Sequence, residues 1–221
     1  MNSRELFHIL AAIIIFAVII SISSIFVLEQ DFAESITKAF FFAILIIAIN
    51  IIAKKMMARA LDSDVEHELW FWERWGVKAH QYIPKPIPIG IVLPLFFIIF
   101  SLGRFKFPVF LTYEARALKT RASKRFGFYS YIEMTDWHHA LIGAAGIVSV
   151  LVLSLITYML PLNGVEFLAQ LAAYYAFCNM LPISKLDGTQ ILFGSRIMYV
   201  TLAIITIIFT IYSVIISLGL I

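Results

Sequence analysis

Long runs of apolar residues, separated by short polar connectors, make up most of this chain. Five runs are long enough to cross a bilayer, because a helix rises about 1.5 Å per residue and the hydrocarbon core is about 30 Å thick. They cover residues 9–28, 36–56, 139–160, 165–181 and 198–221. The pattern predicts an all-α polytopic membrane protein with a single membrane domain over residues 1–221.

A sixth apolar run, residues 87–102, is shorter, and prolines crowd its entrance at positions 84, 86, 88 and 94. Proline lacks a backbone N–H and restrains the residue before it, so the first half of this run is poorly suited to a regular helix. Residues 104–125 are strongly basic and residues 54–85 are also rich in Lys and Arg. The positive-inside rule places both connectors in the cytoplasm. We therefore predict a re-entrant or interfacial hairpin, five full crossings and a cytoplasmic amino terminus; six crossings is the alternative.

Composition supports the membrane class. Hydrophobic residues make up 62% of the chain and charged residues 14%, whereas a soluble domain is about 45–50% apolar. The net charge of +3 is attributed to cytoplasmic connectors and not to nucleic-acid binding. The expected partner is the lipid bilayer, and the expected location is a prokaryotic cell membrane. The single Cys178 excludes an intrachain disulfide.

The stretch HELWF, residues 67–71, begins like the HExxH motif of zinc proteases. Phe71 stands where the second histidine is required, and residues 66–72 alternate as a strand does. We therefore expect no metal site here.

Polar side chains within the apolar runs are the candidates for function, because they are costly in lipid and face the interior of a helix bundle. Asn50 and Lys54 lie in the second run. Their i, i+4 spacing puts them on one face of a helix.

A second polar group occupies NMLPISKLDG, residues 179–188. This stretch resembles the NxxP and LDG motifs of the site-2 protease family, which are intramembrane zinc metalloproteases. The resemblance implies that Asp187 holds the position of the third zinc ligand. It also implies that Asn179 and Pro182, with Gly188, border a groove for an extended substrate. Residues 135–154 resemble the central helix of the family, although its frequent GPxxN motif is missing.

The HExxH helix of the family should lie upstream, where residues 50–54 are NIIAK. In this alignment Asn50 and Lys54 replace the two histidines, and Ile51 replaces the glutamate base. A lysine ammonium has only donors, and isoleucine has no proton chemistry. Asp187 alone cannot hold a catalytic zinc, which takes three protein ligands. The resemblance therefore implies a site-2 protease-like core without catalytic residues, metal or cofactor, which binds membrane segments of partner proteins.

Two alternatives stay open: an active intramembrane protease that holds zinc through Asp187 and unorthodox ligands, and a small proton-coupled transporter. We hypothesise that the Lys54 ammonium takes the place of the metal and pairs with Asp187, helped by Asn50. This predicts a nitrogen-to-oxygen distance within about 4 Å. The alternative is that Lys54 extends to the headgroups beside Lys55.

Overall fold

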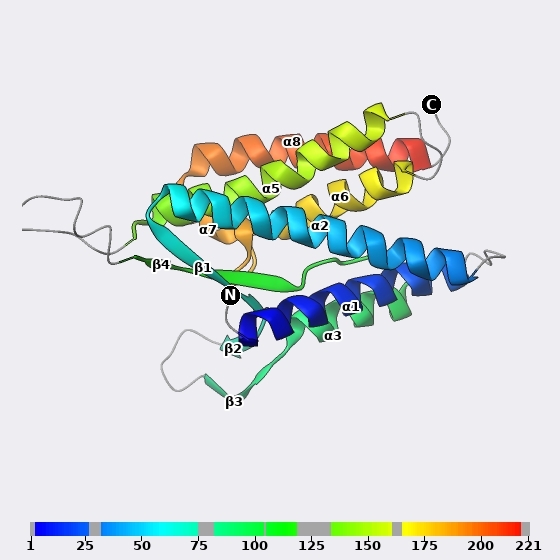
Figure 1. The fold of residues 1–221 in the computed structure, drawn as a ribbon, viewed down its shortest axis with the longest axis horizontal. Helices are drawn as coiled ribbons and strands as arrows, with labels where there is room; N and C mark the ends of the chain where they lie inside the picture. Colours follow the sequence, from blue (N-terminus) through cyan, green and yellow to red (C-terminus); the bar gives the residue numbers. More distant parts are fainter. Residues whose placement is uncertain are drawn as a thin grey trace, which may run out of the picture. The chain divides into compact units, whose positions relative to one another are not determined.

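The computed structural model describes residues 3–26, 32–74, 82–103, 105–118, 134–160 and 165–217. In this part of the chain the fold is mostly helical, as expected (Figure 1). The helices are α1 (Ser3–Phe26), α2 (Phe32–Ala60), α3 (Ile89–Phe100), α5 (Asp136–Met159), α6 (Glu166–Asn179), α7 (Asp187–Gly194) and α8 (Arg196–Ser217). The strands are β1 (Ser63–Leu69), β2 (Trp72–Arg74), β3 (Tyr82–Ile87) and β4 (Leu111–Ala117). β1 pairs with β4 and β2 with β3, so the all-α prediction omitted two small sheets.

Four of the described helices are long and apolar enough to cross a membrane. They are Ser3–Ile22, Glu34–Ala60, Asp136–Met159 and Arg196–Ile216. The run at residues 165–181 was predicted to cross, but α6 has only 14 residues. Such a helix is about 21 Å long, shorter than the hydrocarbon core. Pro182 follows closely and disfavours a helical conformation of the residue before it, which explains the early end.

Helix α3 occupies the apolar run behind the proline cluster. Its 12 residues begin directly after Pro88 and include Pro94. A regular helix therefore starts earlier than the prolines suggested, because proline at a helix start removes no helical hydrogen bond. At about 18 Å it is too short to cross. Residues 29–31, 104 and 119–125, which carry much of the charge argument, lie outside the described residues, and the orientation stays a prediction.

The chain divides into two compact units, Met1–Ile44 with His67–Thr112 and Leu45–Glu66 with Tyr113–Ile221. In the first unit, α1 packs on α3. The rings of Phe16 and Phe110 lie 5.2 Å apart. The His67 Nδ1 lies 3.3 Å from a carboxylate oxygen of Glu5, and both side chains are buried. Residues 67–69 lie in β1, whose burial alternates, so HELWF is not on a helix.

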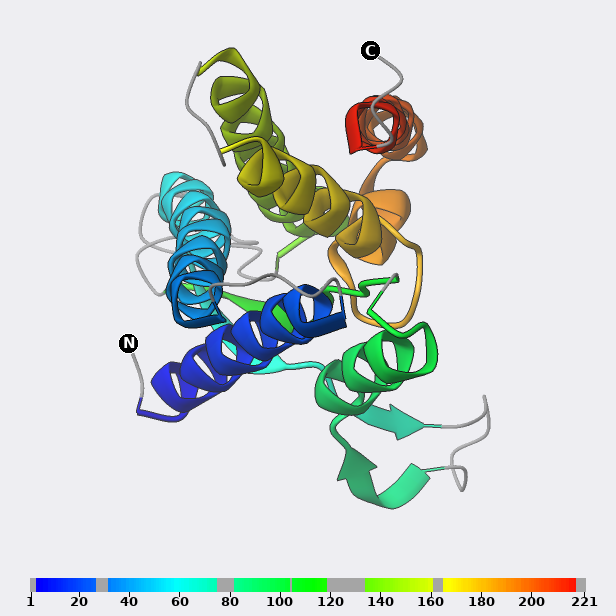
Figure 2. The same cartoon turned by 90° about the vertical axis from the view of Figure 1, so that its right-hand side faces the viewer.

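In the second unit, α5 packs against α6 and α7, and α8 packs against both α6 and α7. Figure 2 views α8 nearly end-on, in red, beside α6 and α7. The Ser154 hydroxyl on α5 donates a hydrogen bond of 2.8 Å to the Ala169 carbonyl on α6. A buried cluster joins α2, β1, β4 and α5, formed by Ala58, Val65, Tyr113 and Ile142. This packing brings the carboxyl-terminal half of α2 to the start of α7.

Candidate functional site: a buried ion pair

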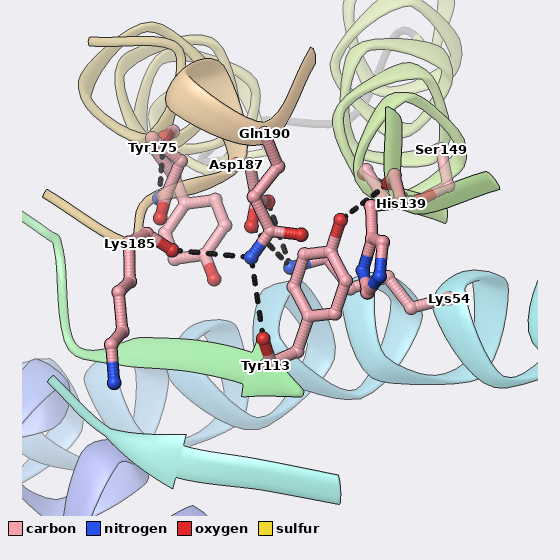
Figure 3. A network of polar contacts seen from close by, with 10 residues as sticks. Lys54, Tyr113, His139, Ser149, Tyr175, Lys185, Asp187 and Gln190 are labelled. Carbon is pink, nitrogen blue, oxygen red and sulfur yellow. Dashed lines mark hydrogen bonds and ion pairs between the residues drawn. The ribbon is translucent and has the colours of Figure 1, made fainter. Parts of the chain in front are cut away.

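Lys54 and Asp187 form a buried ion pair in the second unit (Figure 3). The Lys54 Nζ donates a 2.8 Å hydrogen bond to Oδ1 of Asp187 and lies 2.7 Å from Oδ2. The two side chains are 3% and 1% exposed. The predicted contact is therefore confirmed, and the alternative in which Lys54 extends to the headgroups is wrong.

Local structure places the carboxylate. Leu186 is extended and Asp187 begins α7, so its side chain lies at a helix amino terminus, where the helix dipole favours negative charge. Gly188 follows for a packing reason. A Cβ there would lie 2.0 Å from the Met180 carbonyl oxygen, so only glycine lets α7 approach the end of α6. The LDG sequence thus fixes where the carboxylate points.

Two residues that the sequence analysis did not single out complete the surroundings of Lys54. Its Nζ lies 4.7 Å from the centre of the Tyr113 ring, within the range of a cation–π contact. The Tyr113 hydroxyl donates a 2.6 Å hydrogen bond to the His139 carbonyl. On α5, a Cβ at Gly146 would lie 2.5 Å from Lys54 Cε and 2.9 Å from Asn50 Nδ2. A glycine inside a helical pattern, three residues after Gly143, was the sequence signal of this close approach.

Burial and the ammonium have opposite effects on the carboxylate. Removal from water raises the pKa of Asp187, and the Coulombic attraction of Lys54 and its hydrogen bond lower it, with burial the larger effect. Burial, and then the charge of Asp187, also raise the pKa of Tyr113 well above its ordinary value. The site therefore holds an ionised carboxylate only through its close pairing with Lys54.

Several buried polar atoms around the pair lack a hydrogen-bond partner among the described residues. They are Asn50 Nδ2, Thr189 Oγ1 and Gln190 Oε1. Asn50 is buried and close to Gly146, and its Nδ2 donates no hydrogen bond to Asp187. Ile51, which the motif resemblance aligns with the glutamate base, is also buried.

The two proposed groove residues lie at the end of α6 and in the loop that follows it. Asn179 is buried and its Nδ2 donates a 2.9 Å hydrogen bond to the Tyr175 carbonyl of its own helix. Pro182 is exposed in the loop before α7. Cys178 is a buried free thiol at the end of α6. Among the residues that the structure describes, no group of three His, Cys, Asp or Glu side chains could hold a metal ion.

No protein-family model, curated protein or solved structure matches the chain. The resemblance to the site-2 proteases therefore rests on the motif residues.

Proposed function

We propose that the protein is a catalytically inactive relative of the site-2 proteases, which binds an extended segment of a membrane partner without cutting it. The observation that supports this is the 2.7 Å contact between Lys54 and Asp187. In the family alignment these residues replace the second histidine and retain the aspartate of the zinc site. Two side chains that would converge on a metal converge on one another instead.

The chemistry of the replacements opposes hydrolysis. The Lys54 ammonium offers donors only, and its contact occupies both carboxylate oxygens. Asn50 is a neutral amide, a poor substitute for an imidazole ligand. Ile51 cannot take a proton from a water molecule, which is the role of the glutamate in a zinc protease. The proposed function is therefore binding.

Strand β4 offers a suitable edge for an extended partner. Leu118 N–H donates to the Asp62 carbonyl, and Trp70 N–H donates to the Phe110 carbonyl. Because residue numbers rise along β1 and fall along β4 at these contacts, the two strands pair antiparallel. The backbone groups of the even-numbered β4 residues therefore form the hydrogen bonds to β1. Odd-numbered residues, beginning with Tyr113 in this unit, direct their backbone groups to the opposite edge. An added strand would bond there through its main chain.

The proposal is tested by restoring the zinc ligands. The triple variant Asn50→His, Ile51→Glu and Lys54→His is purified, and its zinc is measured by mass spectrometry beside the wild type. We expect substoichiometric zinc in the wild type and about one zinc per chain in the variant, since three protein ligands are then available. Adding Asp187→Ala should remove it.

Two results would contradict the proposal. Stoichiometric zinc in the wild type that is lost on Asp187→Ala would favour the active protease. A folded triple variant that takes up no zinc would show that the four positions do not form a former metal site.

A further inference from the structure

The side chain of Gln190 on α7 lies against the outer edge of β4. Its Nε2 donates hydrogen bonds to the Tyr113 carbonyl, at 3.3 Å, and to the Lys185 carbonyl, at 3.4 Å (Figure 3). The Tyr113 carbonyl is one of the acceptors that an added strand would use. A side-chain amide thus occupies the place of a partner's backbone N–H.

In this arrangement the hydrogen-bonding groups of the Gln190 side chain are poorly satisfied. Both hydrogen bonds exceed the common range of about 2.7–3.2 Å for an N–H donor. The Gln190 Oε1 and the Thr189 Oγ1 are buried without a hydrogen-bond partner among the described residues. A buried acceptor without a donor is unfavourable. An arrangement that releases the Gln190 amide and gives the Tyr113 carbonyl a shorter hydrogen bond can therefore replace the present one.

We propose that Gln190 is a latch that closes the outer edge of β4 and that an incoming extended segment displaces it. The inference rests on the proposed strand addition and names the residue that controls it. It also restricts the partner. The residue opposite Tyr113 must supply a backbone N–H, so proline is excluded from that position.

The test uses a tethered peptide of defined sequence. Arg116, an exposed residue of β4, is changed to cysteine in a Cys178→Ser background. The probe is the synthetic peptide Cys-Gly-Gly-Thr-Val-Thr-Val-Thr, and a matched peptide carries proline in place of the first valine. The readout is the equilibrium constant of the mixed disulfide against glutathione, because tethering turns strand pairing into an intramolecular step.

We expect Gln190→Ala to raise the preference for the valine peptide over the proline peptide about three- to tenfold, the effect of one ordinary net hydrogen bond. Gln190→Glu should raise the preference by a similar factor, because a carboxylate of nearly the same size cannot donate a hydrogen bond. This second variant keeps the test valid if the alanine variant does not fold. Gln170→Ala on α6 is the matched control and should leave the preference unchanged.

The outcomes separate the two proposals. If the wild type and all variants prefer the valine peptide over the proline peptide by the same factor, the latch is overturned and strand addition still holds. If no variant distinguishes the two peptides, strand addition itself is overturned, and the latch with it.

Discussion

Removing one partner of the Lys54–Asp187 pair should destabilise the protein far more than removing both. At 2.8 Å and an effective dielectric constant of about 20, the attraction between the charges is about 6 kcal/mol. Desolvation of two buried charges offsets much of it. The single variants Lys54→Met and Asp187→Asn each leave an uncompensated buried group, and each should lower the free energy of unfolding by about 3–5 kcal/mol. The double variant buries no charge and should lie within about 1 kcal/mol of the wild type.

The measurement is a double-mutant cycle. The free energy of unfolding is obtained in mixed detergent micelles from tryptophan fluorescence and circular dichroism for the wild type, both single variants and the double variant. The coupling energy should reach at least about 3 kcal/mol. Lys38→Met is the matched control, because Lys38 lies 2.7 Å from Glu34 on the same helix with side chains 57% and 62% exposed. Solvent screens this pair, so the unfolding midpoint should hardly change.

Either of two results would refute the reasoning. One is an effect of Lys54→Met no larger than that of Lys38→Met. The other is a double variant whose loss equals the sum of the two single losses, which would show that the charges do not stabilise one another.

Two further predictions concern the surroundings of the pair. Gly146→Val should cost about 1–3 kcal/mol of unfolding free energy, because the new Cβ lies 2.5 Å from Lys54 Cε and overpacks the site; an unchanged denaturation curve would contradict this. Tyr113→Phe should cost about 1 kcal/mol through loss of the 2.6 Å hydrogen bond to the His139 carbonyl, measured in the same assay.

The local pattern of the sequence was sufficient for several elements. Apolar run length predicted the helices that became α1, α2, α5 and α8, and alternation correctly ruled out a helical HExxH motif at residues 67–71. The i, i+4 spacing of Asn50 and Lys54 predicted that both side chains share a buried face, and both are buried. Together with the LDG stretch, it also led to the ion pair. These features depend on periodicity and on the high cost of a lone charge in an apolar interior, both of which can be read from residue types alone.

Tertiary structure alone decided what surrounds the pair. Nothing in the sequence near Tyr113 or Gln190 indicates that a ring would lie against Lys54 or that an amide would reach the edge of β4. Asn179 is a motif residue, yet its amide bonds to its own helix. Lys54 and Asp187 are 133 residues apart in the chain. The sequence by itself determined that each of these two charges needed a partner, because burial makes a lone charge unfavourable. Only the packing of α2, α5 and α7 decided which atoms would meet, since contacts between distant segments depend on side-chain shape and close approach and have no period along the chain.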